Sequence, residues 1–113
     1  MALSEGMQYH VELNAGHYIY SAHFPGQPIT PGVCIVQMAR ELIEHSVNKP
    51  LVVRSIKTAK FLSIVNPVDT PELLFNVALS YSKDDGTDSI GAKVEVGWGN
   101  AIFAKLTFEL ISR

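Results

Sequence analysis

The sequence predicts an α+β domain in which one long helix is wrapped by an antiparallel sheet. Residues 33–48 are sixteen residues without proline or glycine, and their apolar side chains recur at steps of three and four. Four later stretches, 51–62, 72–83, 89–99 and 101–112, read as strands rich in β-branched and aromatic residues. A single helix beside about five long strands can bury its apolar face only if the sheet wraps it.

Turn signals separate the expected strands. Segments 7–13 and 17–24 are rich in aromatic and β-branched residues and are divided by "NAG", which predicts an early hairpin or paired strands. "KDDGTD" and "WGNA" are hairpin turns by composition, with Gly86 and either Gly99 or Asn100 at positive φ. Strict alternation over residues 104–110 predicts one buried and one wetter face for the last strand.

The helix has a polar face and a clear end. Its polar residues fall opposite the apolar ones: Gln37, Arg40, Glu41, Glu44, His45 and Asn48. Arg40 and Glu44 are spaced for an ordinary ion pair within the helix. The segment "NKP" ends the helix, because the residue before a proline is pushed out of the α region.

Composition predicts a single domain over residues 1–113 in a reducing cytoplasm. Of the 113 residues, 47% are apolar and 18% charged, which is enough for a real core. The net charge is −2 and the cations are scattered, which argues against a nucleic-acid partner. A single cysteine excludes an internal disulfide, and the sequence shows neither an export signal nor an apolar run long enough for a membrane.

The stretch "HFPGQPITPGV" (23–33) concentrates the chemistry of the chain. Its three prolines fix φ, and Gly26 and Gly32 permit conformations closed to other residues, so we expect a rigid loop that holds His23 against the helix start. The first helical amides, those of residues 33–35, should be unpaired and directed outward, which suits a carbonyl oxygen that gains negative charge. His23 can exchange a proton near neutral pH, but on residue type alone a histidine in this setting is more often a structural hydrogen-bonding group.

The same stretch resembles the signature of the 3-hydroxyacyl-acyl-carrier-protein dehydratases of the hotdog fold. Eight positions match the pattern His-Phe-Pro-Gly-x-Pro-x-x-Pro-Gly-Val. The segment "KTAKFLSIVNPVD" (57–69) is similar to a second family segment, and the order of elements agrees along essentially the whole chain. The resemblance therefore implies a hotdog fold, with one central helix wrapped by the sheet.

The resemblance also implies an activity and partners. The substrate would be a 3-hydroxyacyl thioester on the phosphopantetheine arm of acyl carrier protein, and two copies of the chain would join their sheets in a homodimer or dimer-based oligomer. His23 of one subunit would remove the α-proton, the amide of Gly32 or Val33 would hold the thioester carbonyl, and the second catalytic group would come from the central helix of the other subunit. From residue type alone, Phe24 and Phe61 could line an acyl tunnel, although aromatic strand residues usually form core. No metal and no organic cofactor are implied.

This chain departs from the family at one catalytic position. The family places Glu or Asp fourteen residues after the histidine, where this chain has Gln37, and it usually has a glutamine one turn later, where this chain has Glu41. A carboxamide cannot exchange a proton near pH 7. Because the two positions share a helix face, we hypothesise that Glu41, through a water held by Gln37, supplies the acid. The alternative is that Glu41 belongs to a solvated helix face.

Other reactive or aromatic side chains have structural explanations. Cys34 lies at the helix N-terminus, where a thiol can become nucleophilic, but a buried apolar role is the competing interpretation. His10, His17 and His45 lack the spacing of a metal site. Three aromatic residues could line an acyl tunnel, but aromatic strand residues usually form core: Phe75, Trp98 and Phe103. Three cations on one expected strand could contact an acidic carrier protein or mark an edge strand: Arg54, Lys57 and Lys60.

Three functions remain open at this stage. The first is a dehydratase acting on carrier-bound 3-hydroxyacyl chains in fatty acid or polyketide-type synthesis. The second is a hotdog thioesterase in which a helix carboxylate such as Glu41 activates water. The third is a non-catalytic subunit that binds acyl chains or completes the interface of an active homologue. The "HFPG…PGV" stretch favours the first over the second, and Gln37 favours the third.

Overall fold

The computed structural model describes residues 4–17, 29–84 and 86–113. Its elements are β1 (Ser4–Glu12), α2 (Gly32–Val47), β2 (Leu51–Phe61), β3 (Glu72–Asp84), β4 (Thr87–Trp98) and β5 (Ala101–Ser112). The predicted helix and the four later strands are confirmed to within two residues at each end. The second early strand, expected at 17–24, lies outside the described residues except for His17. Among the described residues no helix is long and apolar enough to span a membrane.

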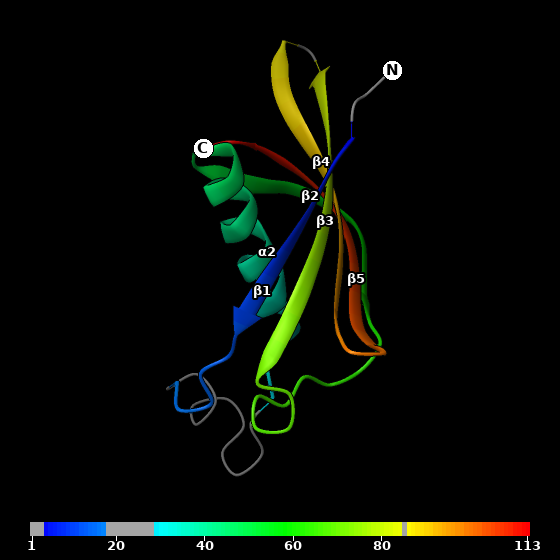
Figure 1. Cartoon of the computed structure of the whole chain (residues 1–113). Helices are drawn as coiled ribbons and strands as arrows, with labels where there is room; N and C mark the ends of the chain where they lie inside the picture. The colour runs from blue at the N-terminus through cyan, green and yellow to red at the C-terminus, as the bar shows by residue number, and fades with distance from the viewer. Residues whose placement is uncertain (1–3, 18–28, 85) are drawn as a thin grey trace.

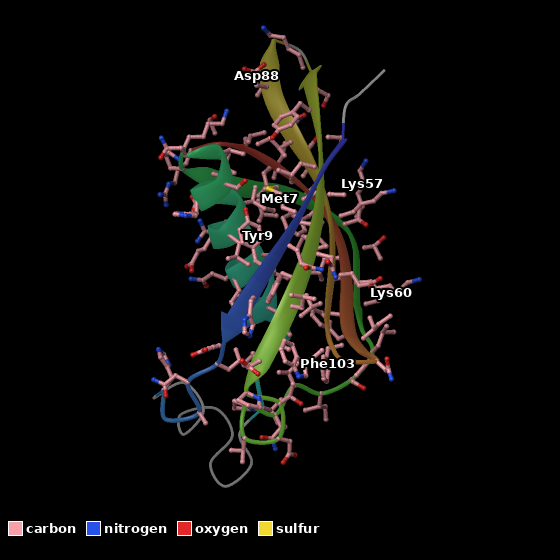
Figure 2. All side chains as sticks on the ribbon, in the orientation of Figure 1. Met7, Tyr9, Lys57, Lys60, Asp88 and Phe103 are labelled. Carbon is pink, nitrogen blue, oxygen red and sulfur yellow. The ribbon has the colours of Figure 1, made fainter. Side chains whose placement is uncertain are left out.

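The strands form one antiparallel sheet with the order β1-β3-β4-β5-β2. Figure 1 shows α2 along one face of this sheet, with the sheet curving around it. The helix contacts both outermost strands: the Ser46 hydroxyl donates to the Met7 sulfur on β1 (2.8 Å), and Arg40 donates to the carbonyl of Leu51 on β2 (3.4 Å). Figure 2 shows Met7 on the helix side of the sheet, whereas Lys57 and Lys60 project from the other side.

The core lies between α2 and the inner face of the sheet. The helix contributes Ile35, Ala39 and Ile43, each at most 2% exposed. The alternation predicted for the last strand is confirmed, because its inward residues are at most 2% exposed and Lys105 between them is exposed: Ala104, Leu106, Phe108 and Leu110. Since each strand residue points to the opposite face from its neighbour, this register leaves the other sheet face polar.

Three residues with positive φ end elements where the sequence predicted turns. Gly86 (φ 79°) and Gly99 (φ 60°) sit in the two late hairpins, where glycine adopts this conformation without steric cost. Asn48 (φ 57°) is the left-handed C-cap of α2, and its amide donates to the carbonyl of Glu44. The helix therefore ends at Val47, one residue before the predicted limit.

An ionic clamp joins the end of α2 to the start of β2. Arg40 Nη1 lies 2.7 Å from Glu44 Oε1, which confirms the predicted ion pair. The other carboxylate oxygen of Glu44 accepts the amide of Leu51 at 2.6 Å. That hydrogen bond is the main reason why the pKa of Glu44 lies below its usual range, with partial burial opposing it and the charges of Arg40 and Arg113 adding to it. Glu44 is thus a structural residue, not part of a solvated face.

Glu44→Gln is expected to lower stability at neutral pH and to lower it less in acid. A carboxyl whose folded pKa is depressed stabilises the fold above its unfolded pKa, and this contribution is lost as the pH falls below about 4.5 toward the folded value. Thermal unfolding of both proteins from neutral pH to about pH 3 measures the difference. Glu95→Gln, which alters an exposed carboxylate on β4, is the control. A constant gap between wild type and Glu44→Gln would contradict the linkage.

Candidate functional site

The start of α2 presents two free backbone amides. Pro31 is the N-cap, and its carbonyl accepts the amides of Cys34 (3.0 Å) and Ile35 (3.3 Å). The prediction that both of these amides are unpaired is therefore wrong, because the first turn folds back tightly onto Pro31. Within the described part of the chain, the amides of Gly32 and Val33 have no hydrogen-bond partner. The positive end of the helix dipole lies behind these two N–H groups.

The loop after β2 holds the helix start in place. The amide of Thr30 donates to the carbonyl of Val65 at 2.8 Å, and both residues are buried, at 5% and 1% exposure. Farther along this loop, the Asn66 side chain accepts the amide of Val68 at 2.9 Å, which closes a local turn. The family-like segment "VNPVD" thus buttresses the residue that precedes Pro31, so the two free amides have a fixed position.

Gly32 leaves room for a close neighbour, the ring of Phe61, and is not explained by its backbone conformation. Its φ is not positive. A Cβ built on Gly32 would lie 2.7 Å from Cζ of Phe61 and 3.0 Å from both Cε atoms, which is closer than real Cβ contacts come. The structure therefore brings Phe61 against Gly32, and Val33 follows Gly32 in the chain, so three predicted binding residues lie together. Phe61 (48%) and Val33 (73%) are both exposed. The predicted residues His23 and Phe24 lie outside the described residues.

Gln37 and Glu41 are hydrogen-bonded to each other on the exposed side of α2. Gln37 Nε2 donates to Glu41 Oε1 at 3.2 Å, so the contact is direct and needs no bridging water. Arg40 Nη2 lies 3.8 Å from the same oxygen, and the Glu41 side chain is 57% exposed. The amide of Gln37 therefore orients a carboxylate that remains open to a ligand or to another chain.

A pocket of about 550 Å³ lies beside this pair, between α2 and the end of β1. Its polar wall includes Gln37, Glu41, Glu12 and His17, and its apolar wall includes Met38. Sequence reasoning missed Glu12 and His17 as pocket residues. His17 follows the "NAG" turn, which was the sequence feature that could have placed it near the end of β1. In this turn the Asn14 side chain accepts the amide of Gly16 (2.9 Å), and the Asn14 carbonyl accepts the amide of His17 (3.0 Å). A larger hollow, about 660 Å³, is lined by Gln8, Asn76, Lys93 and other strand residues, with no residue of α2.

The remaining candidates have structural roles. Burial raises the pKa of the Cys34 thiol, which opposes a nucleophilic role for it at the helix start. His10 contacts Glu72 at 2.9 Å and stacks on Trp98 with ring centroids 5.3 Å apart, as expected for a strand-face residue. Phe75 (0% exposed) and Phe103 (8%) belong to the core. The cations of β2 lie on an outermost strand, as an edge role predicts.

A helix wrapped by a five-stranded antiparallel sheet in this order defines a hotdog domain, as the resemblance implied. Three comparisons agree with this class. A model of the ApeI-like family, described as ApeI dehydratase, matches residues 2–90. Over 68 residues the chain is 40% identical to the 3-hydroxyacyl-[acyl-carrier-protein] dehydratase FabZ of Wolbachia pipientis wMel. The matched region covers 51% of this chain and 46% of the relative. The chain thus spans about half the length of that relative.

Solved structures share the fold at low identity. The dehydratase heterocomplex ApeI:P of Xenorhabdus doucetiae has a TM-score of 0.62 and 14% identity, with 98% of this chain and 96% of that chain covered. A mutant of the fluoroacetyl-CoA-specific thioesterase FlK has a TM-score of 0.65 and 12% identity, with 98% and 87% covered. These likenesses concern the fold alone. Since the family model matches residues 2–90, which is most of this chain, the chain belongs to the ApeI-like dehydratase family.

Proposed function

We propose that this protein is a dehydratase that converts a 3-hydroxyacyl thioester, carried on acyl carrier protein, into the enoyl thioester and water. The observation that carries the proposal is the pair of free amides at Gly32 and Val33, at the end of the "HFPGQPITPGV" stretch. Two N–H groups at a helix start stabilise an oxyanion, which forms when a proton leaves the carbon next to a thioester carbonyl. A carboxylate, Glu41, lies further along the same helix.

The residues act in a balanced elimination. The imidazole of His23 removes the α-proton, and the electron pair of that C–H bond moves onto the thioester oxygen as an enolate. The amides of Gly32 and Val33 hold the enolate oxygen. The enolate collapses to form the C2–C3 double bond as the C3–O bond breaks, and the carboxylic acid of Glu41 donates the proton with which the hydroxyl leaves as water. Gln37 orients the Glu41 carboxyl through its 3.2 Å hydrogen bond.

We infer that two copies of the chain assemble through β2. This strand lies at the end of the sheet order and exposes apolar side chains, with Val52 at 41% and Ile56 at 50%. An exposed, apolar edge strand is a template for pairing with another chain. In such a dimer His23 of one subunit would serve the Glu41 of the other, and no metal or cofactor takes part. A monomer in sedimentation experiments would contradict this assembly.

Product analysis tests the reaction directly. The purified protein is given a 3-hydroxyacyl thioester of acyl carrier protein, and the product is followed by mass spectrometry. Loss of one water with the thioester intact is expected. Release of free thiol would instead identify a thioesterase, the second candidate, which Glu41 favours as a water-activating carboxylate and for which the FlK likeness offers a fold precedent. We propose that this reaction belongs to fatty acid or polyketide-type synthesis in the cytoplasm.

A non-catalytic role is the third candidate and has its own signature. Gln37 stands where the dehydratase family has its catalytic carboxylate, and one structural neighbour is described as the dehydratase heterocomplex ApeI:P. A degenerate subunit would give neither enoyl product nor free thiol alone, but would co-purify with a homologue that carries both the histidine and the carboxylate. Activity of the isolated chain with a 3-hydroxyacyl thioester excludes this role.

A further inference from the structure

The contact between Phe61 and Gly32 joins two distant parts of the chain at the proposed oxyanion site. Phe61 is the last residue of β2, and Gly32 is the first residue of α2. The tip of the ring faces Gly32, because its Cζ and both Cε atoms are the atoms nearest to a Cβ built there. The Gly32 N–H is one of the two free amides, so an aromatic ring stands beside the position proposed for the thioester carbonyl.

The backbone of Phe61 is fixed in the sheet, while its ring is partly exposed to solvent. Phe61 pairs with Ala104 of β5, which is fully buried, so its backbone is fixed by the sheet. Phe61 is nevertheless 48% exposed, so one side of the ring is accessible to a ligand. The exposed ring therefore offers apolar contact to a ligand whose carbonyl oxygen is held by the neighbouring N–H groups.

We propose that Phe61 is the residue that selects the acyl group, by limiting the bulk that fits within the first few carbons beyond the thioester carbonyl. This inference rests on the proposed function. Because the ring contacts the residue that holds the carbonyl, it acts on branching close to the reacting carbons more than on the length of a distant chain. A missing or extra methylene in an apolar pocket changes discrimination by about 10- to 200-fold.

Two variants perturb the same contact from opposite sides. Phe61→Ala removes the ring, whereas Gly32→Ala adds a Cβ that pushes the ring away while the backbone of the helix start is kept. The displaced atoms are the far end of a half-exposed side chain, so the second variant should fold. Ile102→Ala is the matched control, since Ile102 is an exposed apolar residue (40%) on β5.

Turnover is measured with 3-hydroxyhexanoyl and 3-hydroxy-4-methylpentanoyl thioesters, which have equal carbon numbers and differ in branching. Phe61→Ala is expected to raise the branched-to-linear ratio of kcat/KM by about 10-fold. Gly32→Ala alone should change this ratio relative to wild type. Added to Phe61→Ala, it should cause no further change, because the ring that the new Cβ would push away is then absent. The ratio in Ile102→Ala should equal that of wild type. An equal change for both substrates in Phe61→Ala would overturn the proposal.

A binding measurement separates this inference from the proposed reaction. Hexanoyl- and 4-methylpentanoyl-coenzyme A cannot lose water, so calorimetry with these probes reports acyl selection without catalysis. If wild type forms no enoyl product, the dehydratase proposal fails, and a changed ratio of dissociation constants in Phe61→Ala still supports acyl selection. An unchanged ratio, or no binding of either probe to wild type, overturns the selection role.

Discussion

His23→Ala is expected to lower the rate of enoyl formation by about 10²- to 10⁴-fold, the usual effect of removing a positioned general base. The fall should appear in kcat, because the imidazole acts on the reacting proton and contributes little to holding the thioester. The rate of enoyl formation under saturating substrate measures it. His45→Ala, which removes an exposed histidine in the last turn of α2, is the control and should retain full activity. Equal rates in His23→Ala and wild type would remove His23 from the mechanism.

Mixing two inactive variants tests whether each site is shared between subunits. Purified His23→Ala and Glu41→Gln proteins are unfolded, mixed in equal amounts and refolded together. If each site combines His23 of one copy with Glu41 of the other, half of the dimers are mixed and each carries one intact site, so roughly a quarter of the wild-type activity returns. If both residues act within one subunit, every subunit lacks one of them and no activity returns.

Much of the fold is readable from the sequence because its signals are local. The helical period over residues 33–48, the glycines of the two late hairpins and the alternation of the last strand each depend on neighbours within a few residues. Burial follows from the same alternation, as the inward residues of β5 show. The pairing of β1 with β3, between residues sixty or more apart, has no such local signal.

The site was less predictable because it depends on contacts between distant segments. The resemblance placed Gly32 and Val33 at the carbonyl site, and Phe61 was a candidate for an acyl tunnel by its residue type. The sequence attributed Gly32 to backbone freedom, whereas the structure shows the ring of Phe61 in the space where a Cβ would lie. Of the three amides expected to be free, only that of Val33 is, because the carbonyl of Pro31 accepts the amides of both Cys34 and Ile35. Glu44 looked like a surface residue until its bond to Leu51 was visible.

Loss of the Glu41 carboxylate, which hydrogen-bonds Gln37 on α2, is expected to cause a second large loss of activity. Glu41→Gln keeps a side chain of the same shape but removes the acid, so enoyl formation should fall by about 10²-fold or more. Stability should not change measurably, since the Glu41 side chain is 57% exposed and substitutions at such surfaces are usually within about 0.5 kcal/mol. A normal thermal midpoint with a large loss of kcat therefore identifies a chemical role, while full activity would assign Glu41 to a solvated face.

The double variant Gln37→Glu/Glu41→Gln then asks whether the carboxylate must occupy one position. It places the carboxylate where the dehydratase family has it, and the amide four residues later can still donate across the pair, as Gln37 does at 3.2 Å in this chain. Recovery of activity relative to Glu41→Gln is expected, because one acid and one amide again face the substrate. Gln37→Glu alone sets two carboxyls side by side, and their repulsion favours sharing of one proton. A double variant as inactive as Glu41→Gln would mean that the acid works only from position 41.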